Sequence, residues 1–163
     1  MSRLDSFIRR LTAQRDLLNQ AARMVADHPG HVLELGLGNG RTYDHLKSIL
    51  PGRPVYVFDR KVSAHPDSVP DAEHLFLGEF RDTLPAAARR LGATAALAHC
   101  DIGSGDRAAT AALARWLGPA LAPLLAPGAI VLADQPLELP RAAALPQPDS
   151  VPAGRYHLYR IEE

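Results

Sequence analysis

Residues His31–Leu46, with the sequence HVLELGLGNGRTYDHL, decide the fold. The stretch begins with an apolar run that contains one charge, Glu34, and continues with glycines at the alternate positions 36, 38 and 40. The residues that follow have the spacing of a helix with one apolar face. A strand that leads through a glycine turn to a helix N-terminus is where α/β proteins bind nucleotide-like ligands. The stretch therefore predicts an α/β domain with a ligand site at the turn.

The length and composition of the chain indicate one domain without a membrane-spanning segment. Of its 163 residues, 47% are hydrophobic and 22% are charged, as in an ordinary globular domain. No apolar run approaches the roughly 20 residues that cross a bilayer, and the N-terminal residues lack the apolar centre of a secretion signal. The formal net charge is zero and no basic block stands out. We expect a cytoplasmic protein that binds neither membranes nor nucleic acid.

The N-terminal residues 2–27 have the pattern of an amphipathic helix. Ser2 and Asp5 form a start that resembles a capping box. The apolar residues that helical spacing predicts to be buried are Leu4, Phe7, Ile8, Leu11, Leu18, Ala22 and Val25. We expect this helix to pack against the sheet. The alternative is that its polar residues Gln14–Asp16 approach the ligand.

Strand-like and helix-like segments alternate over the rest of the chain. The expected strands are residues 31–35, 55–58, 74–77, 94–100, 129–133 and 156–161. The expected helices are residues 40–50, 82–90 and 106–117, the second capped by Asp82 or Thr83 and the third ended by Gly118-Pro119. The proline-rich segment 135–154 is expected to be irregular. This alternation predicts a doubly wound, mostly parallel Rossmann-like α/β sheet with helices on both faces, a central first strand and a C-terminal edge strand.

Acidic residues stand at or just after the ends of four expected strands, an edge where open α/β sheets bind ligands. They are Asp59, Glu79, Asp101 and Asp134. The turn does not fit a dinucleotide, because Arg41 occupies the place of the third glycine, and no Gly-Lys-Ser/Thr follows it for a triphosphate. Asp59 has the position to accept hydrogen bonds from two ribose hydroxyls.

These motifs together resemble the class I S-adenosylmethionine-dependent methyltransferases. The residues that carry the resemblance are Glu34–Gly40, Val55–Asp59, Gly78-Glu79, Cys100-Asp101 and Leu125–Val131. The sequence GNGRTYDHL is also similar to a small group of bacterial proteins regarded as methyltransferases. The resemblance covers roughly residues 31–134, and with the length of the chain it predicts a single methyltransferase-like domain over residues 1–163. Its parts are an N-terminal helix in 1–28, a cofactor-binding core in 31–134, and a loop with the edge strand in 135–163.

The resemblance also implies a site for S-adenosylmethionine. Its expected residues are Glu34, Gly36, Gly38, Asn39, Gly40, Arg41, Thr42, Asp59, Arg60, Glu79, Phe80 and Asp101. In this assignment Asp59 binds the ribose, Arg60 lies beside the adenine, and Glu79 accepts from the adenine amino group. Phe80 packs nearby, and Asp101 faces the methionine amine or the acceptor.

Methyl transfer from a sulfonium is an in-line displacement, so the enzyme chiefly aligns the reactants and excludes water. Where the acceptor needs a base, the candidates are Asp101, Asp134 and His99. Asp101, Asp134 and Gln135 also resemble the magnesium ligands of catechol-type O-methyltransferases, except that Gln135 replaces an asparagine. Because of that departure we expect no metal.

The acceptor is expected to be a small molecule of unknown identity. Little sequence remains to build its pocket, so the walls must come from the N-terminal helix, the 60–72 loop, the 135–154 loop or a second subunit. We therefore expect a homo-oligomer. Two other functions stay open: a non-catalytic cofactor-binding or regulatory module on the same fold, and an NAD(P)-dependent oxidoreductase.

Overall fold

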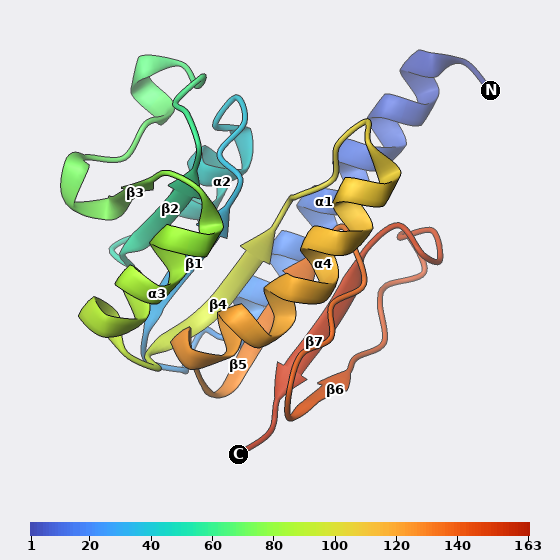
Figure 1. The fold of residues 1–163 in the computed structure, drawn as a ribbon. Helices are drawn as coiled ribbons and strands as arrows, with labels where there is room; N and C mark the ends of the chain where they lie inside the picture. Colours follow the sequence, from blue (N-terminus) through green and yellow to red (C-terminus); the bar gives the residue numbers. More distant parts are fainter.

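The computed structural model describes residues 1–163 and contains one seven-stranded sheet in the order β3-β2-β1-β4-β5-β7-β6 (Figure 1). The strands are β1 (His31–Leu35), β2 (Val55–Asp59), β3 (Leu75–Leu77), β4 (Ala95–Cys100), β5 (Leu125–Ala133), β6 (Ala142–Ala144) and β7 (His157–Ile161). Strands β1 to β5 are parallel, while β7 is antiparallel to β5 and to β6. The mostly parallel α/β sheet is thereby confirmed.

Helices cover both faces of the sheet. They are α1 (Arg3–Met24), α2 (Arg41–Ile49), α3 (Phe80–Leu91) and α4 (Arg107–Leu121), with short 3-10 turns at Pro66–Ser68, Ala72–His74 and Ala122–Leu124. The side chains of α1 and α2 join one hydrophobic cluster, and those of α3 and α4 join a second one across the sheet. No helix is both long enough and apolar enough to cross a membrane.

The C-terminal part of the sheet differs from the prediction. The segment 135–154, expected to be irregular, contains the short strand β6. Strand β6 pairs with β7 on the side away from β5, so β7 is the second strand from the edge and β6 is the edge strand. Three residues, Ala142–Ala144, are too few to show a strand period.

Helix α1 begins with the predicted capping box, in which the Ser2 hydroxyl accepts from the Asp5 amide and the Asp5 carboxylate accepts from the Ser2 amide, each at 3.0 Å. The predicted buried stripe holds only in the later turns, where Leu18, Ala22 and Val25 are buried. Leu4, Phe7 and Ile8 are 66%, 41% and 52% exposed. The reason is positional, because the first turns of α1 extend past the sheet and have nothing to pack against (Figure 1).

Two helix boundaries were predicted wrongly because of proline. Helix α3 begins at Phe80, not at Asp82 or Thr83, and keeps Pro85 inside it. Helix α4 continues through Gly118-Pro119. Packing explains the second case: a Cβ on Gly118 would lie 2.3 Å from the carbonyl oxygen of Glu138. Gly118 therefore lets the chain after β5 approach the helix and does not end it.

Candidate cofactor site

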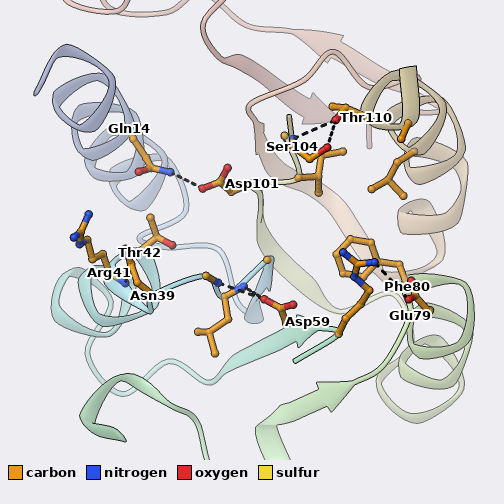
Figure 2. Close-up of a pocket in the computed structure, with 18 of the residues that line it drawn as sticks. Gln14, Asn39, Arg41, Thr42, Asp59, Glu79, Phe80, Asp101, Ser104 and Thr110 are labelled. Carbon is orange, nitrogen blue, oxygen red and sulfur yellow. Dashed lines mark hydrogen bonds and ion pairs between the residues drawn. The ribbon is translucent and has the colours of Figure 1, made fainter. Parts of the chain in front are cut away.

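A cavity of about 610 Å³ opens where β1, β2, β3 and β4 end, within the usual size of small-molecule and cofactor sites (Figure 2). The polar residues that line it are Arg10, Gln14, Asn39, Arg41, Thr42, Asp59, Arg60, Glu79, Arg81, Asp101, Ser104 and Thr110. The apolar and glycine residues that line it are Leu11, Gly36, Leu37, Gly38, Phe80, Ile102, Gly103, Ala109 and Leu113. Ten of the twelve residues predicted to bind the cofactor therefore line this cavity, and only Glu34 and Gly40 do not.

The three glycines of the turn have positive φ angles of 92°, 52° and 85° and different tasks. A Cβ on Gly36 would lie 2.3 Å from the carbonyl oxygen of Asp101, and one on Gly40 would lie 2.6 Å from the Cβ of Ser68. A Cβ on Gly38 would meet nothing within 4 Å. Gly38 therefore leaves its backbone exposed to the cavity that it lines. Gly40, predicted to approach the cofactor, instead begins α2 and makes room for Ser68.

Asp59 holds the turn from the neighbouring strand. Its Oδ2 accepts hydrogen bonds from the amides of Leu37 at 2.8 Å and Gly38 at 3.3 Å. Its Oδ1 has a single long contact, 3.4 Å from the amide of Lys61. One carboxylate oxygen thus shapes the turn, and the other is available to a ligand in the cavity.

Glu34 and His99 form a buried pair beneath the cavity and do not line it. Both side chains are 0% exposed, and His99 Nδ1 lies 2.8 Å from Glu34 Oε1. The hydroxyl of Thr42, which does line the cavity, donates to the same Oε1 at 3.1 Å. Although burial alone would lower the pKa of His99, the Glu34 carboxylate raises it. Both residues are therefore placed to support the site from below, which argues against His99 as a base.

Asp101 is the one candidate base that lines the cavity. Gln14 of α1 donates its side-chain amide to Asp101 Oδ2 at 3.3 Å (Figure 2). Of the three residues 14–16 that could approach a ligand, only Gln14 lines the cavity. Arg15 and Asp16 lie outside it and pair with each other. Gln14 stands at helical spacing between the apolar residues Leu11 and Leu18 of α1, and this spacing separates it from Arg15 and Asp16.

Asp134 serves the backbone of the loop after β4. Its Oδ1 accepts from the Ile102 amide at 3.0 Å and its Oδ2 from the Gly103 amide at 2.8 Å. Burial raises the pKa of Asp134. Neither Asp134 nor Gln135 lines the cavity. Because both oxygens of Asp134 accept hydrogen bonds from the loop, the geometry argues against Asp134 as a base.

The end of the cavity opposite Gln14 and Arg41 is suited to a flat apolar group (Figure 2). Phe80 lies there, and Ile102 and Leu113, which the sequence reasoning missed, also line the cavity. Glu79 is 64% exposed and pairs with Arg60 at 3.8 Å. No periodic pattern marks Ile102 or Leu113 as ligand residues, because a loop and the outer part of a helix bring them there.

Known proteins match this arrangement. The pattern of the S-adenosyl-L-methionine methyltransferase family covers residues 1–161. A crystal structure of an S-adenosyl-L-methionine methyl transferase from Silicibacter pomeroyi DSS-3 is 44% identical, with a TM-score of 0.92 over 98% of both chains. No curated protein matches the chain.

More distant structures share the fold alone. TrmN from Thermus thermophilus is 18% identical, with a TM-score of 0.57 over 89% of this chain and 47% of that one. The MycE methyltransferase of mycinamycin biosynthesis, crystallised with Mg and SAH, is 19% identical, with a TM-score of 0.58 over 94% of this chain and 48% of that one.

Proposed function

This chain belongs to the S-adenosyl-L-methionine methyltransferase family, and on that premise we propose that its cavity receives the cofactor together with a small-molecule acceptor of the methyl group. One observation carries the proposal: a single cavity is lined by the glycine turn, by Asp59 and by Asp101. The resemblance to class I methyltransferases implies that the glycines approach the methionine and ribose parts of S-adenosylmethionine, that Asp59 binds the ribose, and that Asp101 faces the methionine amine or the acceptor. Because the chain belongs to this family, the NAD(P)-dependent oxidoreductase is no longer an alternative.

The residues present fit this cofactor. Gly38 leaves the backbone open to the cavity, and Asp59 Oδ1 is available to the ribose hydroxyls. The apolar side chains of Phe80, Ile102 and Leu113 suit a purine ring. When bound, S-adenosylmethionine supplies an electrophilic methyl group on a sulfonium.

Asp101 is the residue that we assign to the reacting end. Gln14 holds one of its oxygens, which restricts the carboxylate without neutralising it. A carboxylate in this position binds an ammonium group or accepts a proton from an acceptor hydroxyl or amine. Leu11 and Leu37 line the same cavity and exclude water around it.

The small-molecule acceptor is supported by the size and charge of the protein. The cavity measures about 610 Å³. The formal net charge of the chain is zero and its sequence has no basic block, which favours a small acceptor over nucleic acid. Of the segments expected to complete the pocket, α1 supplies Arg10, Leu11 and Gln14, the 60–72 loop supplies Arg60, and the 135–154 loop supplies none.

Calorimetry with the product S-adenosylhomocysteine (SAH) tests the proposal. We expect the protein to bind SAH and S-adenosylmethionine in a one-to-one ratio and to show no binding of NAD under the same conditions. Incubation with methyl-labelled cofactor and a panel of small hydroxyl, amine and carboxylic acid compounds then tests turnover. Absence of SAH binding would refute the cofactor assignment. Binding without turnover on any acceptor would favour the non-catalytic alternative.

We also propose that the protein is a homo-oligomer in a cytoplasmic setting. The first turns of α1 expose Leu4, Phe7 and Ile8 next to Arg10 and Leu11 of the cavity. A second subunit over these side chains would bury apolar surface and close the mouth of the site. Sedimentation should give at least a dimer, and F7S/I8S should shift it toward the monomer. R9Q, on the same helix, serves as the control. A monomeric wild-type protein would contradict the proposal.

A further inference from the structure

The loop that follows β4 forms one wall of the cavity, through the successive residues Ile102–Ser104. The hydrogen bonds of the sheet end just before this wall, where the Asp101 amide donates to the Leu35 carbonyl at 3.0 Å. From Ile102 onward the chain has left the sheet, so its backbone amides need acceptors from elsewhere. The place of this wall therefore depends on the side chains that supply those acceptors.

Two side chains from other parts of the chain supply them. Asp134, directly after β5, accepts from the Ile102 amide at 3.0 Å through Oδ1 and from the Gly103 amide at 2.8 Å through Oδ2. Thr110 of α4 accepts from the Ser104 amide at 3.2 Å, and its hydroxyl lies 3.0 Å from that of Ser104 (Figure 2). Asp134 thus holds the first two amides of the wall, and no other group in the structure accepts from them.

Asp134 stands to this loop as Asp59 stands to the glycine turn. Asp59 ends β2, the neighbour of β1, and holds the amides of Leu37 and Gly38 in the turn after β1. Asp134 follows β5, the neighbour of β4, and holds two amides in the loop after β4. The two carboxylates therefore fix two segments that line the same cavity. They differ in that Asp59 keeps one oxygen for a ligand, whereas both oxygens of Asp134 are occupied.

Gly103 shows how closely the carboxylate approaches the loop. A Cβ at this position would lie 2.5 Å from Asp134 Oδ2 and 3.3 Å from Gln135 Nε2. The φ angle of Gly103 is not in the left-handed region, so the backbone itself would accept an alanine. The missing side chain at residue 103 is therefore required by the Asp134 carboxylate.

We propose that Asp134 is a positioning residue, which holds Ile102 and Gly103 where they contact the purine ring of the cofactor. Asp134 does not line the cavity, so it acts through the loop and does not touch the ligand. A wall that is fixed before binding need not be ordered at the moment of binding, and this favours affinity. The inference rests on the proposed function, because it assigns the wall to bound cofactor.

Calorimetry with SAH tests the role of the carboxylate. We expect D134A to weaken SAH binding by about tenfold or more, because two amides lose their acceptor. D134N keeps one acceptor oxygen and should recover part of the affinity. D149A removes the same charge from an exposed residue outside the cavity and should bind SAH like the wild type. In the ligand-free protein, D134A should speed hydrogen exchange at the amides of residues 102 and 103 and leave that of β4 unchanged, which a general loss of stability would not do.

A second variant tests whether Asp134 acts through the loop. We expect G103A to weaken SAH binding, because its methyl group displaces the carboxylate, and we expect G103A/D134A to bind no more weakly than D134A. If G103A has the same cost with and without Asp134, the two residues are not coupled and the inference is wrong. Unchanged SAH binding in D134A would also overturn it and leave the proposed function standing. A wild-type protein that does not bind SAH would refute the proposed function and this inference with it.

Discussion

Replacement of Glu34 by alanine is expected to lower the free energy of unfolding by about 3–5 kcal/mol, because it leaves a buried charge without its partner. His99 is 0% exposed and pairs with Glu34 at 2.8 Å. The variant would also remove the acceptor of the Thr42 hydroxyl. Urea unfolding measures the loss.

A double variant separates stability from function at this pair. Replacing both residues with leucine, E34L/H99L, removes the charges together and should cost far less than E34A, since an apolar pair needs no partner. SAH affinity should nevertheless fall in the double variant, because Thr42 would lose the contact that fixes it at the cavity. A stable double variant with unchanged SAH affinity would show that the pair has no part in the site.

The pair also predicts how stability depends on pH. The Glu34 carboxylate raises the pKa of His99 above its ordinary value of 6.5, against the effect of burial. The folded chain therefore keeps a proton that the unfolded chain releases, and stability falls as the pH rises above about 6.5. Burial lowers the pKa of His31, His45 and His157, so their effect lies on the acidic side of 6.5. In the variant E34Q, which lacks the charge, the free energy of unfolding should no longer decrease as the pH rises above about 6.5.

Local patterns were enough to predict the sheet and the turn. The apolar run before Gly36 and the acidic residue at the end of the next strand are features of neighbouring residues. The structure makes the run the buried strand β1 and places Asp59, the last residue of β2, at the cavity. The strand β6 and the course of α4 through Pro119 depend on packing against distant segments. Local propensity does not contain that information.

The candidate site divides in the same way. Residues that follow strands, such as Asp59 and Asp101, were found from their positions along the chain. Arg10 was not found, because a helix that lies elsewhere in the sequence brings it to the cavity. The sequence predicts that Glu34 and His99 act at the ligand, whereas the structure buries them as a pair that does not line the cavity. A strand pattern does not tell whether a polar side chain faces a ligand or a buried partner.

Replacement of Asp59 by alanine is expected to weaken the binding of S-adenosylmethionine by about 3 kcal/mol, roughly 150-fold, through the loss of charge-assisted hydrogen bonds. Two contributions add here. Oδ1 would no longer receive the ribose hydroxyls, and Oδ2 would no longer hold the amides of Leu37 and Gly38. Calorimetry with SAH measures the sum.

The variant D59N divides these contributions. Its amide keeps one acceptor oxygen, which either holds the turn or receives the ribose, so its affinity should lie between those of the wild type and D59A. Adenine lacks the ribose, and its weaker binding should therefore change only through the turn. If D59A stays folded and binds SAH like the wild type, the ribose assignment is wrong. If it loses adenine and SAH equally, Asp59 acts through the glycine turn alone.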